Sequence, residues 1–268
     1  MILQKFVVLM MALAMASMYA RLGFAAQEPA PKTKVENNEA SALLMSFADF
    51  LGQAKQFSVT IRAEYDAVQK TGQKIQFGEV RRVTLARPNR LRVDAEQSDG
   101  DKSTVLFDGR EITVWSPDEK MYATASKTGD VDQAVRYLLD GLHLKLPLAM
   151  MYVTDLPSEF KSRVRSVAVV ENDVTTDVPC THLAARTDEV DFQFWIPSKG
   201  DPLPRRVVIT YKNDPGQPQF SANLSEWNLS PNAPESLFAF NPPPDAHRIQ
   251  FLAMAEVAKS GIEKGEKK

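Results

Sequence analysis

Few residues of this chain have the types and spacing that catalysis requires. Cys180 and His182 lie two positions apart, so on a strand their side chains would share a face and could form a thiolate–imidazole pair. No nucleophile elbow or helix N-terminus is expected there to activate the thiol, and a buried cysteine beside a polar histidine is the simpler interpretation. The sequence also lacks a G-x-S-x-G motif and a glycine-rich phosphate loop. We therefore expect a protein that is not an enzyme and has no catalytic residues.

Residues that could bind a metal ion are equally scattered. His143, His182 and His247 lie far apart and outside any H-E-x-x-H spacing, and a single cysteine excludes a zinc site built from clustered thiolates. Adjacent carboxylates such as Asp188 and Glu189 fit a solvated turn between strands. The sequence therefore predicts no metal site and no cofactor.

The charge balance excludes a further class of partner. The 268 residues include 32 basic and 34 acidic side chains, which gives a formal net charge of −2. Such a chain has no basic field to attract phosphates, so we expect no nucleic-acid binding. A hydrophobic content of 44% is that of a globular chain and not of a disordered one.

The N-terminal residues have the pattern of a secretory signal. Lys5 precedes an uncharged apolar run over residues 6–20, which is too short to span a bilayer comfortably, and the small residues Gly23 and Ala25 suit signal peptidase. We expect residues 1–26 to be a cleaved signal peptide and the protein to be periplasmic; an uncleaved N-terminal anchor is the alternative. No cysteine lies near the cleavage site to carry a lipid, so membrane contact should be transient at most.

The hydrophobic periodicity then changes along the chain. A charged, proline-containing tether is expected over residues 27–38, and an apolar stripe at helical spacing follows over residues 39–56. Residues 57–65 alternate between apolar and polar side chains, which is typical of a strand with one buried face. Asp130 is a candidate N-cap for a second helix, and residues 142–153, which contain Pro147 and two methionines, form an irregular apolar segment that can adapt its packing.

Alternating segments of this kind recur at meander spacing up to residue 228. No strand is followed by a helix at the interval that a parallel sheet requires, so the sheet should be antiparallel. We expect an α+β, mainly β, domain over residues 39–249 with about ten or eleven strands, followed by a charged helical tail over residues 250–268. Helices beside such a sheet either complete a filled core or enclose a ligand cavity, and a sheet with this many strands favours the cavity.

Several short motifs resemble a known family in their order and spacing. They are L-A-R-P-N-R-L-R-V at 85–93, F-D-G at 107–109, I-T-V-W-S-P at 112–117, F-W-I-P at 194–197, L-P-R-R-V-V-I at 203–209 and F-A-F-N-P-P at 238–243. Together they are similar to a branch of predicted periplasmic proteins within the superfamily of LolA- and LolB-type lipoprotein carriers. The resemblance covers residues 41–249.

This resemblance implies a curved antiparallel sheet that forms an incomplete β-barrel, with helices as a lid over its open side. It also implies an apolar cavity for acyl chains and a lid-holding role for Arg87, which matches the arginine of the carriers' R-P motif. An arginine that only caps the turn before Pro88 is the alternative. Two departures distinguish this chain from the carriers: an additional region over residues 165–186 and the absence of the lipidated cysteine of LolB-type proteins.

We therefore expect a periplasmic carrier or binding protein for a hydrophobic or amphiphilic ligand such as a lipid or a lipoprotein acyl group. The alternative is a non-catalytic envelope module that docks a protein partner. If the apolar strand faces line a cavity, six residues are expected to contact the ligand: Ile61, Leu85, Val93, Trp115, Leu138 and Met150.

Overall fold

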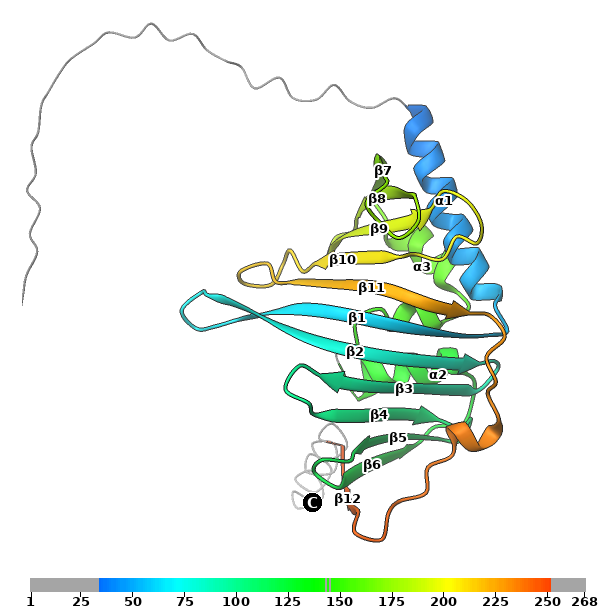
Figure 1. Ribbon diagram of the computed structural model, residues 1–268, viewed down its shortest axis with the longest axis vertical. Helices are drawn as coiled ribbons and strands as arrows, with labels where there is room; N and C mark the ends of the chain where they lie inside the picture. Colours follow the sequence, from blue (N-terminus) through cyan, green and yellow to red (C-terminus); the bar gives the residue numbers. More distant parts are fainter. Residues whose placement is uncertain (1–33, 143, 145, 252–268) are drawn as a thin grey trace, which may run out of the picture. The chain divides into compact units, whose positions relative to one another are not determined.

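The computed structural model describes residues 34–142, residue 144 and residues 146–251 (Figure 1). The expected signal peptide, most of the expected tether and nearly all of the expected C-terminal tail lie outside the described residues. The helices and strands of the described part run from Lys34 to Ile249.

Twelve strands form one sheet in the order β12-β6-β5-β4-β3-β2-β1-β11-β10-β9-β8-β7. The strands are β1 Gln56–Val68, β2 Lys74–Ala86, β3 Arg90–Gln97, β4 Lys102–Phe107, β5 Glu111–Ser116, β6 Met121–Ser126, β7 Ser166–Asp173, β8 Cys180–Arg186, β9 Asp191–Pro197, β10 Arg206–Thr210, β11 Gln219–Asn228 and β12 His247–Ile249. Every neighbouring pair is antiparallel except β12 and β6, which are parallel. The sheet is not closed into a barrel, because β12 and β7 are its edges. The predicted fold class is confirmed, with one or two more strands than expected.

The sheet consists of two local meanders that are joined in the middle. Strands β1 to β6 follow one another along the chain, and so do β7 to β11. The joint is the antiparallel pair of β1 and β11, in which Ile61 lies opposite Leu224 and Tyr65 opposite Phe220. Strands far apart in sequence therefore form the centre of the sheet.

Helices cover one face of this sheet (Figure 1). They are α1 Lys34–Gln53, α2 Val131–Arg136, the π-helical turn η1 Tyr137–Gly141, the 3-10 turn η2 Ala149–Tyr152 and α3 Leu156–Arg163; a further 3-10 turn, η3 Glu235–Phe238, follows β11. Helix α1 begins five residues before the expected Glu39 and ends at Gln53, because Gln56 already pairs in β1. Helix α2 has the expected N-cap: Asp130 Oδ1 accepts from Gln133 N at 2.9 Å, and Gln133 Oε1 accepts from Asp130 N at 3.2 Å.

The alternation of β1 decides which face the helices cover. Phe57, Val59, Ile61 and Ala63 are buried on this face, which we call the inner face. Strand register places Leu85 of β2 on the same face, opposite Phe57. Side chains of α1, α2 and the helical turns fill the space above them in one continuous core, led by Phe47, Leu51, Val135, Leu138 and Val153.

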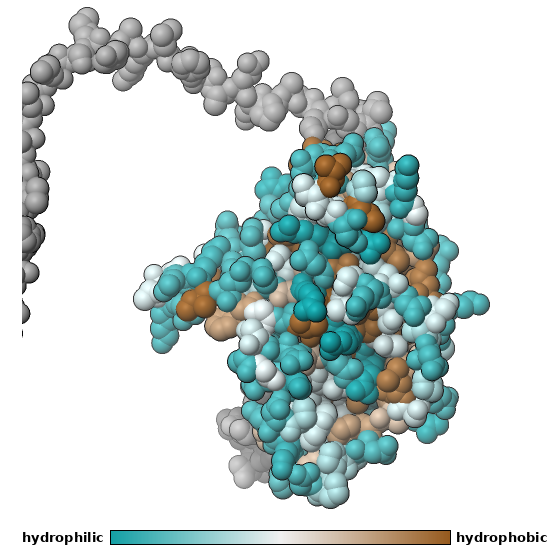
Figure 2. Space-filling model, viewed as in Figure 1, coloured by the Kyte–Doolittle hydropathy of each residue, from teal (hydrophilic) through white to brown (hydrophobic). Residues whose placement is uncertain are grey.

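The outer face of the sheet has its own cover at one end. Polar residues dominate much of this face (Figure 2), but the segment after β11 crosses strands β3 to β6. Phe238 is buried there, and the ring of Phe240 lies 5.7 Å from that of Trp115 and 5.1 Å from that of Tyr122. Arg92 Nη1 donates to the carbonyl of Leu237 at 3.0 Å. The segment then adds β12 to the edge of β6.

No helix among the described residues has the length and apolarity needed to cross a membrane.

The buried side chain of Leu85 allows a test of the core. Leu85 is fully buried, so Leu85→Ala should lower the free energy of unfolding by about 2–5 kcal/mol, because a cavity replaces packed atoms. Urea unfolding followed by circular dichroism measures this loss. Val174 is 75% exposed, and Val174→Ala is the control, with an expected change below about 0.5 kcal/mol. A Leu85→Ala variant as stable as the control would show that this position is not packed as described.

Candidate ligand-binding site

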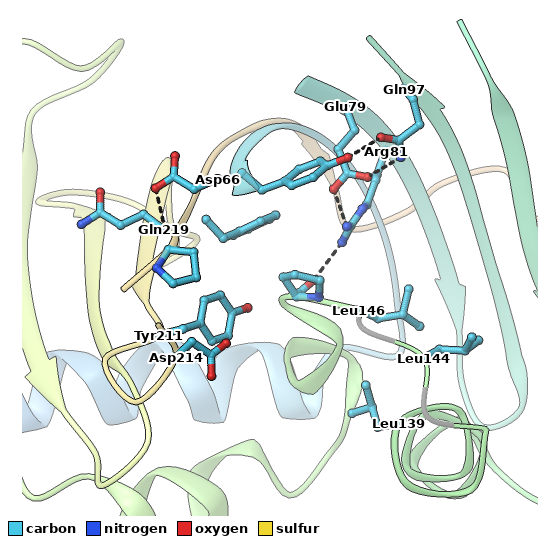
Figure 3. A pocket seen from close by; sticks show the side chains of 14 residues that line it. Asp66, Glu79, Arg81, Gln97, Leu139, Leu144, Leu146, Tyr211, Asp214 and Gln219 are labelled. Atoms are coloured by element: carbon cyan, nitrogen blue, oxygen red, sulfur yellow. Dashed lines mark hydrogen bonds and ion pairs between the residues drawn. The ribbon is translucent and has the colours of Figure 1, made fainter. Parts of the chain in front are cut away.

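A cavity lies at the end of the sheet where the β1–β2 and β10–β11 hairpins turn (Figure 3). Its volume of about 570 Å³ is within the usual range for ligand sites, about 300–1,000 Å³. We call it the main cavity. It is lined by Tyr65, Asp66, Glu79, Arg81, Gln97, Leu139, Leu144, Leu146, Pro147, Tyr211, Asp214, Pro218, Gln219 and Phe220.

A second cavity of about 250 Å³ lies between η2, α3 and the inner face of β9 and β10. Most of its lining side chains are apolar, so we call it the apolar cavity. The apolar side chains that line it include Leu148, Met150, Met151, Leu156, Phe160, Phe192, Phe194, Val207 and Ile209. Glu159, Arg163, Thr187 and Glu189 add polar groups to it.

The two cavities share a wall. Leu146, Pro147 and Tyr211 line both of them. Leu146 and Pro147 also border a void of about 20 Å³ beneath η2, together with Arg81 and Tyr152. The segment Leu146–Pro147 is therefore the partition between three spaces, and its displacement would join them.

A chain of polar contacts holds this partition to the sheet. Tyr65 Oη donates to Gln97 Oε1 at 3.1 Å, and Gln97 Nε2 donates to Glu79 Oε2 at 3.1 Å. Glu79 forms an ion pair with Arg81, and Arg81 Nη1 donates to the carbonyl of Pro147 at 2.9 Å (Figure 3). The side chains of Glu79 and Arg81 are only 5% and 9% exposed. Each charge therefore requires the other to compensate for its removal from water.

The local sequence explains both ends of the contact between Arg81 and Pro147. In β2, Glu79 and Arg81 have the same parity as Val83 and Leu85, so the pleat directs all four side chains to the inner face. At the other end, Leu148 has a φ of +69°, which turns the chain sharply after Pro147. A left-handed conformation costs a non-glycine residue of order 1–3 kcal/mol, so the turn needs contacts such as that of Arg81 to persist.

The residues expected to line one cavity are distributed over several places. Ile61 and Leu85 are buried in the packed core and line none of the cavities described here. Val93 and Leu138 meet at the void of about 20 Å³, which has room for about one water molecule. Only Met150 lines one of the two larger cavities, the apolar one. Between the middle of the sheet and the helices, a filled core replaces the expected cavity.

Trp115 lies on the other face of the sheet. It pairs with Thr104 and Tyr122, whereas the inner-face residue Val114 pairs with Val105. Its ring packs against Phe240 of the segment after β11. A strand next to a second covering segment is apolar on both faces, so parity alone does not identify the inner one. Trp115 therefore lies outside the cavities described here, and a contact with ligand stays a prediction.

Arg87 has the expected contact with a helix end. Its Nε donates to the carbonyl of Ala54, just after α1, at 3.0 Å, and its Nη1 lies 3.3 Å from Asp132 Oδ1 on α2. Asp132 in turn accepts from the amide of Thr154. Arg87 thus links α1, α2 and the chain before α3, but it does not contact the partition. Its role in holding a lid stays a prediction.

The sequence analysis did not single out Glu79, Arg81 or Tyr211. One signal was available for the first two: charged residues at the apolar parity of a strand otherwise marked by Ile75, Phe77, Val83 and Leu85. Such residues are buried in pairs or lie where the apolar cover ends. Tyr211 follows β10 directly and carried no comparable signal.

Cys180 and His182 share the outer face, as strand geometry predicts, but they bind different partners. Cys180 Sγ donates to the carbonyl of Val178 at 3.3 Å, and burial raises the pKa of its thiol. The imidazole of His182 stacks on Trp195 at 3.9 Å and its Nε2 lies 2.9 Å from Gln193 Oε1. This geometry favours a neutral buried thiol and a structural histidine. Within the described part of the chain, no three His, Cys, Asp or Glu side chains gather as metal ligands.

The contact between Arg81 and Pro147 generates a prediction about local opening. Arg81→Met alone would leave Glu79 buried and unpaired, so the test uses the double variant Glu79→Gln, Arg81→Met. Loss of a hydrogen bond of about 1.5–3 kcal/mol should accelerate hydrogen exchange at the amides of Ala149 and Met151 by about tenfold or more. Exchange at β10 should not change.

Arg82→Met is the matched control, because Arg82 is the next residue of β2 and is exposed. Equal exchange at Ala149 and Met151 in the double variant and the unchanged protein would show that Arg81 does not hold the partition.

Comparisons with solved structures find distant likenesses. The lipoprotein LppX of Mycobacterium tuberculosis is 15% identical, with a TM-score of 0.45 over 73% of this chain and 98% of LppX. LprF of Mycobacterium bovis is 12% identical, with a TM-score of 0.43 over 78% of this chain and 98% of LprF. A LolA superfamily protein of Nitrosomonas europaea is 11% identical, with a TM-score of 0.37 over 75% of this chain and 97% of that protein. Likenesses this distant say nothing about a ligand.

A comparison with curated proteins and one with family profiles give different results. No curated protein matches the chain. Residues 40–252, however, match the family described as predicted periplasmic protein (DUF2092), which is the kind of family that the sequence motifs indicated. This match covers most of the chain and agrees with the predicted periplasmic localisation. The chain belongs to the DUF2092 family of predicted periplasmic proteins.

Proposed function

We propose that this protein binds an amphiphilic ligand with an acyl chain, its polar end in the main cavity and its chain in the apolar cavity. One observation carries the proposal: a mixed-polarity cavity and an apolar cavity share the wall formed by Leu146, Pro147 and Tyr211. An amphiphile needs both environments side by side. The ligand would be a free lipid or the acyl group of a lipoprotein, and binding rather than chemical conversion would be the activity.

The energetics support entry of a chain past the partition. Burial of each methylene contributes about 0.8 kcal/mol, whereas the charge-assisted hydrogen bond from Arg81 to Pro147 is worth about 1.5–3 kcal/mol. About four buried methylenes would therefore offset the loss of this bond. A ligand with about sixteen carbons has a large surplus, and a ligand without a chain has none.

The groups in the main cavity suit binding. Glu79 and Arg81 are already paired with each other. Burial raises the pKa of Tyr211, so its phenol remains a neutral hydrogen-bond donor. These groups provide polar contacts for a head group and no activated nucleophile.

Binding of a fluorescent amphiphile with an uncharged hydroxyl head group and a chain of about sixteen carbons tests the proposal. The protein secreted into the periplasm should bind the probe and should release co-purified lipid in native mass spectrometry. Leu146 borders all three spaces, so Leu146→Trp should fill their junction and weaken binding by about tenfold or more. Val174→Trp places the same side chain at an exposed site and should bind normally.

If the unchanged protein binds neither the probe nor a co-purified lipid, the carrier proposal fails. Docking of a protein partner, the alternative function, would then be favoured.

Arg87 gives a second test of the proposal. Arg87→Leu removes the contacts with Ala54 and Asp132, so the helices should separate more readily from the sheet. We expect this variant to keep the fluorescent amphiphile longer when an acceptor membrane is added, because the closed empty form is destabilised. Equal transfer rates for Arg87→Leu and the unchanged protein would show that Arg87 only caps the turn before Pro88.

A further inference from the structure

We propose that the ligand's head group is an ammonium group that binds in the main cavity between Asp66 and Asp214. This inference rests on the proposed function and adds the chemical class of the ligand. It follows from the balance of charges and from the aromatic side chains in the cavity wall.

The described lining of the main cavity has an excess of negative charge. Its ionisable side chains, tyrosines aside, are Asp66, Glu79, Arg81 and Asp214. Glu79 and Arg81 neutralise each other. Among the described lining residues, two carboxylates therefore remain without a cationic partner.

Neither remaining carboxylate is paired with a buried cation among the described residues, and Asp214 is exposed. Asp66 Oδ2 accepts from the amide of Gln219 at 3.0 Å, and its nearest cation, Lys74 Nζ, lies 3.6 Å away with a side chain that is 42% exposed. Such a pair is weak because solvent screens it. The side chain of Asp214 makes no ion pair or hydrogen bond with a described residue. Asp214 lies beside Tyr211 in the view of the cavity (Figure 3).

Aromatic rings complete an environment suited to a cation. Tyr65, Tyr211 and Phe220 line the same cavity. A cation is attracted to the face of an aromatic ring, most strongly where water is excluded. The protein already contains such a contact here, because the guanidinium of Arg81 lies 5.7 Å from the centre of the Phe220 ring.

An anionic head group would find the opposite conditions. The only cation in the described lining is Arg81, which is engaged with Glu79 and the carbonyl of Pro147. A carboxylate or phosphate would have to displace one of these contacts and would also face Asp66 and Asp214. Repulsion between these carboxylates and an anionic head group lowers the affinity for an anionic ligand.

The turns beside the cavity carry charges of both signs, including the exposed Lys70 between β1 and β2 and Lys74 at the start of β2. Asp99 and Asp101 lie in the turn after the lining residue Gln97, and Asp140 follows the lining residue Leu139. All three aspartates are exposed.

Three fluorescent amphiphiles with identical chains test the inference. They end in trimethylammonium, carboxylate or hydroxyl. We expect the trimethylammonium probe to bind about tenfold or more tightly than the carboxylate probe at low ionic strength, with a smaller ratio at high salt. The double variant Asp66→Asn, Asp214→Asn should bring the ratio close to one.

A second double variant controls for net charge. Asp188→Asn, Asp201→Asn removes the same charge at two exposed residues outside the main cavity and should keep the full preference. Tetramethylammonium is a head group without a chain and should displace the trimethylammonium probe only weakly.

Each other outcome contradicts a specific statement. Equal binding of the three amphiphiles, or tighter binding of the carboxylate probe, would overturn the charge inference and leave the acyl-chain proposal standing. Binding of none of them would overturn both. If tetramethylammonium displaces the bound probe as effectively as the unlabelled trimethylammonium amphiphile does, the ligand is a small cation. This result would overturn the acyl-chain proposal.

Discussion

The buried ion pair of Glu79 and Arg81 is the constraint on which the candidate site depends. Removing two charges from water is costly, and their attraction compensates only if their remaining polar atoms also find partners. Gln97 supplies one partner to Glu79, and the carbonyl of Pro147 supplies one to Arg81. The chain before η2 must therefore stay close to the sheet at one point. The main cavity and the apolar cavity meet at this point.

The inner face of the sheet consequently has two regions. Around Leu85, apolar side chains from the sheet and the helices interdigitate and leave only a void of about 20 Å³. Toward the β1–β2 hairpin, charged and polar side chains replace them and the helices no longer cover the strands completely. The open space lies where the covering layer ends, and not in its centre as in a barrel with an empty interior.

The sequence predicted the local features of this fold better than the assembled ones. Alternation along residues 57–65, the N-cap at Asp130 and the antiparallel meanders depend on neighbouring residues, and the structure confirms them. The positions of the expected ligand-binding residues relative to the cavities could not be read from the sequence, because lining a cavity depends on packing between distant segments. Trp115 illustrates this: its apolar character fits either face, and only the position of Phe240, 125 residues later, decides between them. The contact between Arg81 and Pro147 also joins segments with no shared sequence pattern.

The pairing of β1 with β11 has a consequence for the order of folding. Each meander can form from strands that are close in sequence, but the central joint closes a loop of more than 150 residues, from Ser58 paired with Asn228 to Tyr65 paired with Phe220. The entropic cost of closing a loop rises with its length, and folds rich in such distant pairings form slowly. The middle of this sheet cannot assemble until β11 is available. During synthesis, which begins at the N-terminus, the sheet therefore stays divided at β1 until residues 219–228 are free to pair.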